Sequence, residues 1–270
     1  MWRFSNMDVV RNATTVNCSS VPRRTSPFEC TNYGIYCKTY LKNLPQYNTM
    51  LLCEIDSIPQ SIQKILAEQG ITTLRPSQEK AINAGLLDGN NLLICTPTAS
   101  GKTLIAEIAA ARAILTLHKQ ALYIVPLVAL ANDKHQDFTQ KYSGTFSIAV
   151  STGDLDSPEQ HLATKHLIIC TAEKLDSIMR HQPSWIAKVG VVIIDEIHLL
   201  NDTDRGPTLE ILITWIRKLL PNVQIIGLSA TIGNPQELAD WIDATLVQDT
   251  WRPVPLHIGL LHNHTIDFGK

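Results

Sequence analysis

Eight consecutive residues, Thr96 to Thr103, have the composition of a phosphate-binding loop. They read Thr-Pro-Thr-Ala-Ser-Gly-Lys-Thr and directly follow the apolar run Leu92–Cys95. When a buried strand leads through small residues into a helix, backbone N–H groups and the positive helix end can converge on phosphate oxygens. The pattern predicts that Lys102 reaches the outer phosphates of a nucleotide and that the Thr103 hydroxyl holds Mg²⁺.

The loop departs from the strict pattern at its first position, where Thr96 stands in place of the usual glycine. A Gly/Ser/Thr-rich turn between a strand and a helix, with no ligand, is the alternative interpretation. Because short motifs match by accident, the nucleotide interpretation needs support from other parts of the chain.

A pair of carboxylates follows a second apolar run. Asp195, Glu196 and His198 come directly after the run 191–194. A strand that ends in two carboxylates can present both at the carboxyl edge of an α/β sheet, where ligands bind. Asp195 is expected to bind Mg²⁺, directly or through water, and Glu196 to orient and deprotonate the attacking water. The alternative is an exposed acidic pair that caps the following helix.

Two weaker motifs complete the set. The amide of Gln78 has a donor and an acceptor in one plane, which matches N6 and N7 of adenine and would select ATP over GTP; a solvated helix cap is the alternative. Ser229 and Thr231 follow the apolar run 225–228, where small hydroxyl residues can bridge the acidic pair to a neighbouring surface. The predicted nucleotide-binding residues are Gln78, Thr96, Pro97, Thr98, Ala99, Ser100, Gly101, Lys102 and Thr103; the catalytic residues are Lys102, Asp195 and Glu196; the metal ligands are Thr103 and Asp195.

Short apolar runs alternate with helical patterns over most of the chain. Several runs are apolar without alternation, as expected for strands covered on both faces. Strands that alternate with helices predict an α/β fold with a mostly parallel sheet and helices on both faces. The expected strands are 92–95, 121–125, 147–150, 167–170, 191–194, 225–228 and 245–247.

Two helices are predicted before the first of these strands. Ser57 and Gln60 have the spacing of a capping box, Pro59 lies in the first turn, and Gly70 closes the helix. A second helix is expected over 77–88, with Gly-Asn-Asn turning into the strand that precedes the phosphate-binding loop.

Residues 1–49 differ from the rest in composition. They are rich in Asn, Thr and Ser, and they carry six Lys/Arg against two carboxylates. A disordered or loosely packed extension is the expected interpretation. A basic nucleic-acid arm and a true start at Met50 are the alternatives.

Composition sets further limits. The 270 residues, 44% of them hydrophobic, suffice for one or two domains with a full core. The net charge of -2 argues against non-specific coating of DNA but permits a local groove. The six cysteines include no Cys-x-x-Cys pair, so no zinc is expected, and Cys95 and Cys170 should be buried free thiols. With no bilayer-spanning run and no signal-peptide segment, a cytoplasmic protein without a membrane partner is expected.

The order of these motifs resembles the first RecA-like motor domain of superfamily-two DExH-box helicases. Within that superfamily the chain is most similar to archaeal repair helicases related to the helicase domain of polymerase theta. The resemblance covers roughly residues 52–262 and implies a RecA-like P-loop NTPase domain at 50–255. Residues 256–270 would begin the connection to a second RecA-like domain. The supporting stretches are 97–107, 126–131, 195–198 (Asp-Glu-Ile-His), 205–210, 228–234 (with Ser-Ala-Thr) and 251–256.

The resemblance also implies contacts with nucleic acid. In such loops backbone N–H groups, hydroxyls and helix N-termini contact phosphates, so binding is indifferent to sequence. For each loop an ordinary strand-to-helix turn is the alternative. The stretch 126–134 matches the segment that contacts the nucleic-acid backbone, with Pro126 and Leu127 as its predicted contact residues, and Thr152, Gly153 and Thr171 lie in the other matching loops. The residues that match positions linking hydrolysis to strand movement are His198, Ser229 and Thr231.

By this resemblance the chain is the ATP-binding domain of an ATP hydrolase and helicase that uses ATP and Mg²⁺. Its expected partners are single-stranded or forked DNA, with RNA less favoured, and a second RecA-like domain on another chain. That second domain supplies arginines that contact the γ-phosphate. In related phosphate chemistry such an arginine raises the catalytic rate by roughly 10³–10⁵-fold. Alone, the chain is expected to hydrolyse ATP slowly and not to unwind duplexes. A freestanding nucleotide-dependent binding module without turnover is the alternative; a small-molecule kinase would leave Gln78 and the later motifs without a role.

Overall fold

The structure is a computed structural model that describes residues 50–153, 160–254, 260–262 and 265–267. The extension expected over 1–49 lies outside the described residues and stays a prediction. The same holds for most of the connection expected over 256–270.

One parallel sheet organises the described residues. Its strands lie in the order β3-β4-β2-β5-β6-β1-β7, and every neighbouring pair is parallel. The α/β prediction is confirmed, and the sheet is parallel throughout rather than mostly parallel. The strands are β1 (Leu92–Cys95), β2 (Gln120–Val125), β3 (Ile148–Ser151), β4 (Leu167–Thr171), β5 (Val189–Ile194), β6 (Gln224–Ser229) and β7 (Thr245–Gln248).

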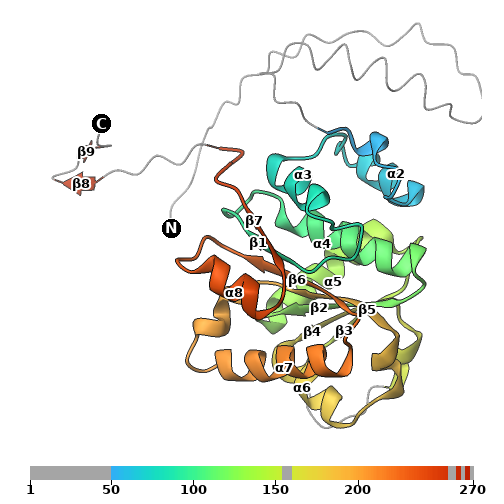
Figure 1. The fold of residues 1–270 in the computed structure, drawn as a ribbon. Helices are drawn as coiled ribbons and strands as arrows, with labels where there is room; N and C mark the ends of the chain where they lie inside the picture. The colour runs from blue at the N-terminus through green and yellow to red at the C-terminus, as the bar shows by residue number, and fades with distance from the viewer. Residues whose placement is uncertain (1–49, 154–159, 255–259, 263–264, 268–270) are drawn as a thin grey trace, which may run out of the picture. The chain divides into compact units, whose positions relative to one another are not determined.

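Helices cover both faces of this sheet (Figure 1). One face carries α2 (Gln60–Glu68), α3 (Pro76–Asn83), α4 (Lys102–Ala111) and α5 (Val128–Tyr142); the other carries α6 (Ala172–Arg180), α7 (Gly206–Leu219) and α8 (Pro235–Trp241). Alternate residues of β1 enter the two cores: Leu92 and Ile94 pack on the first, Leu93 and Cys95 on the second. Because both sides of each central strand are buried, these strands read as continuous apolar runs.

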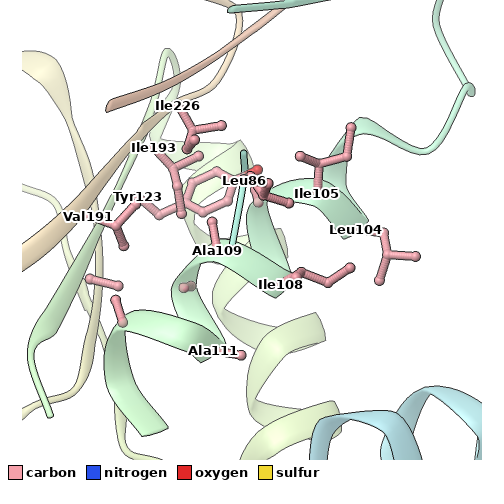
Figure 2. Packing of buried hydrophobic residues seen from close by; sticks show 14 of the residues in the cluster. Leu86, Leu104, Ile105, Ile108, Ala109, Ala111, Tyr123, Val191, Ile193 and Ile226 are labelled. Carbon is pink, nitrogen blue, oxygen red and sulfur yellow. The ribbon is translucent and has the colours of Figure 1, made fainter. Parts of the chain in front are cut away.

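Helix α4 is fixed firmly to the sheet. All its residues from Leu104 to Ala111 are buried. Ile105 and Ala109 belong to the same buried cluster as Tyr123 of β2 and Ile193 of β5, and Figure 2 shows Ala109 next to Tyr123. Burying one such aliphatic side chain contributes about 1.5–3 kcal/mol, so the helix that begins at Lys102 has a rigid base.

Local polar contacts explain where element boundaries differ from the prediction. Strands β2 and β6 begin one residue early, at Gln120 and Gln224. The Gln224 amide, for example, is buried and donates to Leu86 O and Asn90 O, both at 2.9 Å. Apolar runs do not reveal strand residues of this kind, because the glutamine side chain bonds loop carbonyls instead of filling a core.

The predicted start of the first helix is wrong. Helix α2 begins at Gln60 with Pro59 as its N-cap, and Ser57 makes no capping bond there. Gln63 instead donates to Ile55 O and Ile58 O, both at 3.0 Å, and so closes the preceding turn.

The second predicted helix is shorter than expected. Helix α3 ends at Asn83, and Gly85 has a left-handed backbone with φ +92°. Outside the sheet, β8 (Leu260–His262) and β9 (Thr265–Asp267) form an antiparallel pair where no strand was predicted. Across the described ranges no helix has the length and apolarity needed to cross a membrane.

Candidate nucleotide-binding site

Strand order brings the predicted motifs to one edge of the sheet. The phosphate-binding loop follows β1, Asp195 follows β5, and Ser229 ends β6, which lies between them. The Thr96 N–H donates to Ser229 O across 3.3 Å, so the loop and β6 are in direct contact. Lys102 and Asp195 therefore emerge at the same carboxyl edge.

The loop is held by bonds within itself. The Thr96 and Ser100 hydroxyls, both fully buried, lie 2.7 Å apart. This contact explains why threonine can occupy the first position of the motif. Its hydroxyl forms a hydrogen bond that stabilises the loop conformation, whereas a glycine would only allow that conformation. Gly101 then turns the chain into α4 with a left-handed backbone at φ +95°.

Lys102 lies over this loop. Its Nζ donates to Thr96 O at 2.8 Å and Pro97 O at 3.2 Å. Burial lowers the pKa of Lys102 below its ordinary value, and the nearby Glu196 and Asp195 partly offset that effect.

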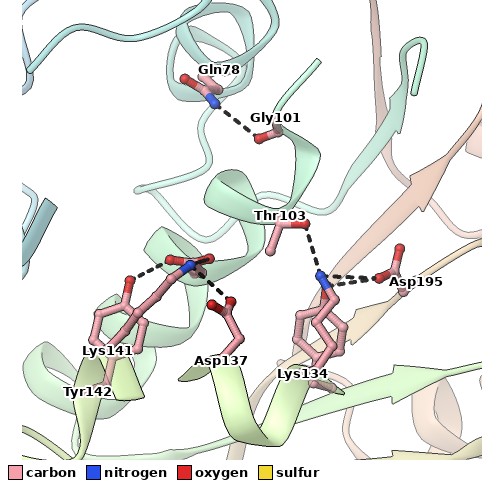
Figure 3. Close-up of polar contacts among 10 residues, drawn as sticks. Gln78, Gly101, Thr103, Lys134, Asp137, Lys141, Tyr142 and Asp195 are labelled. Atoms are coloured by element: carbon pink, nitrogen blue, oxygen red, sulfur yellow. Dashed lines mark hydrogen bonds and ion pairs between the residues drawn. The ribbon is translucent and has the colours of Figure 1, made fainter. Parts of the chain in front are cut away.

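Helix α3 holds the same loop from the outside (Figure 3). Gln78 is buried; its Nε2 donates to Gly101 O at 3.0 Å, and its Oε1 accepts from the Arg75 N–H at 2.8 Å. The Arg75 side chain donates to Ala99 O at 2.8 Å and lies 5.6 Å from the Trp251 ring centre. An adenine contact would require Gln78 to exchange these bonds, so that role stays a prediction. The sequence interpretation missed Arg75, although it lies in the same short motif.

The acidic pair lies opposite the start of α4. Asp195 Oδ2 accepts from the Tyr123 hydroxyl at 3.0 Å and lies 3.9 Å from Lys134 Nζ. The same Nζ donates to Thr103 Oγ1 at 3.0 Å (Figure 3). Thr103 and Asp195 thus present oxygens to one shared cationic group. Hydroxyl and carboxylate oxygens facing one positive charge fit a hard cation such as Mg²⁺.

The three residues expected to couple hydrolysis to movement, His198, Ser229 and Thr231, differ in their surroundings and exposure. His198 Nδ1 lies 3.3 Å from Glu196 Oε2. His198 also lines a hollow of about 200 Å³ with Ile232 and Trp241. It therefore lies between the acidic pair and the segment that follows Thr231. Thr231 is exposed, whereas Ser229 is fully buried and cannot reach an outside surface.

The residues expected to contact nucleic acid follow the other strands at the same edge. Pro126 and Leu127 follow β2, Thr152 and Gly153 follow β3, and Thr171 ends β4. These strands are neighbours in the order β3-β4-β2. We call this part of the edge the β3 half and the part formed by β5, β6 and β1 the β1 half.

Side-chain exposure differs along the β3 half. Leu127 is 44% exposed and Val128 50%. Thr171 is buried, and its hydroxyl accepts the Lys174 N–H at 3.3 Å as the N-cap of α6. The structure therefore places these residues along one edge, with the Thr171 hydroxyl already bonded within the fold.

A buried polar contact that the sequence interpretation missed joins α4 to α5. The Glu107 carboxylate accepts from the Tyr142 hydroxyl and from Lys141 Nζ, which lies 3.0 Å from Asp137. Burial alone would lower the pKa of Lys141, but Glu107 and Asp137 outweigh it and raise that pKa. A glutamate in an otherwise apolar helix was the available signal, because such a group needs a partner when buried.

A strand–loop–helix with Gly-Lys-Thr, facing an Asp-Glu pair across one parallel sheet edge, defines a P-loop nucleotide-binding domain. More specifically, the sequence profile of the DEAD/DEAH box helicase family matches residues 75–238, and the chain belongs to this family.

Known relatives agree with this assignment. Over 214 residues the chain is 53% identical to an ATP-dependent DNA helicase Hel308 of Methanocaldococcus jannaschii, covering 77% of this chain and 18% of that protein. A Caldivirga maquilingensis protein of the same name is 50% identical over 204 residues, covering 76% of this chain and 27% of that one. The expected similarity to archaeal DExH-box helicases is confirmed, and the chain spans about a fifth to a quarter of these relatives.

A solved structure shares the fold. The DUF1998 helicase MrfA bound to DNA superposes with a TM-score of 0.66 and 26% sequence identity, covering 75% of this chain and 31% of that chain. This likeness confirms the RecA-like arrangement of sheet and helices.

Proposed function

We propose that this chain contains the nucleotide-binding first motor domain of an ATP-dependent DNA helicase. The observation that carries the proposal is the meeting of the Lys102 loop and the Asp195–Glu196 pair at one edge of the sheet. Family membership supports the same reaction, and the relatives named above are called ATP-dependent DNA helicases.

Each residue of the site has a role in this proposal. Lys102 leaves its two loop carbonyls to reach the outer phosphates, which offer a stronger acceptor for an ammonium group. Thr103 and Asp195 hold Mg²⁺, which supplies positive charge to the phosphate oxygens when bound. Glu196 orients the attacking water and accepts its proton. His198, in contact with Glu196, transmits the state of the site toward Thr231.

The β3 half is the proposed nucleic-acid surface. Its loops present backbone groups and helix starts, which suit a phosphate backbone and demand no base sequence. DNA is favoured over RNA because the relatives are named DNA helicases. We propose that unwinding requires a second RecA-like domain. The cytoplasmic location expected from the sequence stays a prediction.

Phosphate release by the purified chain tests the proposal, measured with ATP and with GTP, each with and without single-stranded DNA. We expect slow ATP hydrolysis that single-stranded DNA accelerates, with no separation of a forked duplex. Gln78→Ala should reduce the preference for ATP over GTP.

Three outcomes would count against parts of the proposal. Failure to bind any nucleotide would refute it. Nucleotide-dependent DNA binding without turnover would favour a binding module over a motor domain. Processive unwinding by the chain alone would refute the need for a second domain.

A further inference from the structure

Lys134 lies where the two halves of the sheet edge meet. It belongs to α5, which follows β2 in the β3 half. Its amine reaches Thr103 Oγ1 at 3.0 Å and Asp195 Oδ2 at 3.9 Å, both in the β1 half. Strands β2 and β5 are neighbours at this boundary, so the contact joins the α5 helix directly to the proposed metal ligands.

The amine is held in place by more than one contact. It lies 5.5 Å from the Tyr123 ring centre and 5.8 Å from that of Phe138, within the range of cation–π attraction. Tyr123 donates to the same Asp195 oxygen. The side chains of Lys134 and Asp195 are only 20% and 18% exposed. Lys134 is therefore packed in a defined position, unlike a lysine in an exposed ion pair at the surface.

We propose that Lys134 is the resident counter-cation of the metal site and must withdraw before Thr103 and Asp195 can both bind Mg²⁺. This inference rests on the metal role proposed above for these two residues. An ammonium group and a divalent ion repel each other at such separations. Mg²⁺ also requires oxygens at about 2.0–2.1 Å in near-octahedral geometry, which leaves no place for an amine that is bonded to Thr103 Oγ1 and paired with Asp195 Oδ2.

Two consequences follow for the domain. Without a nucleotide, Lys134 neutralises part of the acidic pair and keeps the affinity for free divalent ions low. Nucleotide phosphates bring the additional negative charge that favours exchange of the lysine for the metal. The displaced charge stays on α5, whose N-cap Leu127 and first residue Val128 are exposed on the β3 half. Exchange of the two cations would thus change the charge that the β3 half presents.

Binding of Mn²⁺ to the nucleotide-free 270-residue chain, followed by electron paramagnetic resonance, tests the proposal. Lys134→Met keeps the aliphatic stem and removes the charge, so Mn²⁺ affinity should rise roughly three- to tenfold. Lys134→Arg keeps the charge and should stay within about twofold of the wild type. Lys188→Met is the matched control: it removes one exposed positive charge at the opposite end of β5, and affinity should not change.

Asp195→Asn, measured with ADP present, separates the two hypotheses. If it does not weaken Mn²⁺ binding, the metal role in the proposed function fails and this inference fails with it. If it weakens binding but Lys134→Met leaves affinity unchanged or lower, only the counter-cation inference is overturned. An equal rise in Lys134→Met and Lys134→Arg would also overturn it, because charge would not be the cause. Circular dichroism of each variant checks that folding is intact.

Discussion

Gly101→Ala should destabilise the protein more than its backbone strain alone can explain. A Cβ at Gly101 would lie 2.4 Å from Gln78 Nε2 and 3.2 Å from Arg75 Nη1. Gly89 is the matched control, because its φ of +96° is almost the same as the +95° of Gly101. A Cβ there meets only the Arg112 side chain at 3.5 Å, an ordinary contact.

The expected free energies follow from these two environments. A left-handed backbone costs alanine about 1–2 kcal/mol at either position. At Gly101 the methyl group must also displace the buried amide of Gln78 from its bonds to Gly101 O and the Arg75 N–H. Leaving buried polar groups without partners costs about 1–3 kcal/mol more. Gly101→Ala should therefore lose about 2–5 kcal/mol of unfolding free energy, and Gly89→Ala about 1–2 kcal/mol.

Urea unfolding of both variants, followed by circular dichroism, measures the difference. Gln78→Ala provides a second check, because truncating this amide removes the shortest contact of the added Cβ, the one at 2.4 Å. In the double variant the extra cost of Gly101→Ala should fall to the cost seen at Gly89, so the two changes should not be additive. Equal losses at Gly101 and Gly89, or simple additivity with Gln78→Ala, would refute this explanation of how α3 holds the loop.

Three further predictions concern single charges. Lys102→Ala should remove most of the affinity for fluorescent ATP analogues, whereas Glu196→Gln should retain binding and stop phosphate release; equally poor binding by both would contradict the assigned roles. Lys80 pairs with Asp249 at 2.9 Å. Burial alone would raise the pKa of Asp249, but the Lys80 bond and charge, together with the backbone N–H bonds of Trp251 and Thr250, outweigh it and lower that pKa below the ordinary 3.8. The stability that the pair provides is thus present above pH 3.8 and lost as pH falls through the lowered value. Urea titrations should show wild type exceeding Lys80→Met by less than about 1 kcal/mol at pH 7 and by nothing near pH 2; a constant difference would contradict this sign.

The sequence predicted the sheet well because its central strands are buried on both faces. All seven predicted strands of the sheet are present, with ends shifted by no more than two residues. Cys95 and Cys170 are buried, as their apolar runs indicated. Some of the errors lie where a polar side chain determines a boundary. Gln224 begins a strand by bonding loop carbonyls, and Gln63 closes a turn in place of the expected Ser57 cap.

The site was predictable in its parts but not in its connections. Motif spacing indicated Lys102 and Asp195 because each follows an apolar strand at a fixed offset. Lys134 could not be found in this way, because its partners are 31 residues before it and 61 after it in the chain. The β2–β5 pairing brings Lys134 and Asp195 together, and the strand order β5-β6-β1 brings Thr103 at the start of α4 to the same edge. Lys134 and Lys141 lie two turns apart on α5, a spacing that shows a shared helix face but not what that face contacts.

The strand order also suggests that one continuous segment of this domain could be exchanged in an engineered chimaera. The strands of the β3 half, together with α5 and α6, come from one uninterrupted stretch, 120–180, whereas the phosphate loop and the acidic pair lie before and after it. That stretch can be exchanged between relatives as a single cassette with two junctions. A chimaera built in this way would retain the proposed nucleotide site of one parent and acquire the proposed nucleic-acid surface of the other. Because Lys134 lies within this stretch, the chimaera would have the donor's residue at this position next to the recipient's proposed metal ligands, Thr103 and Asp195.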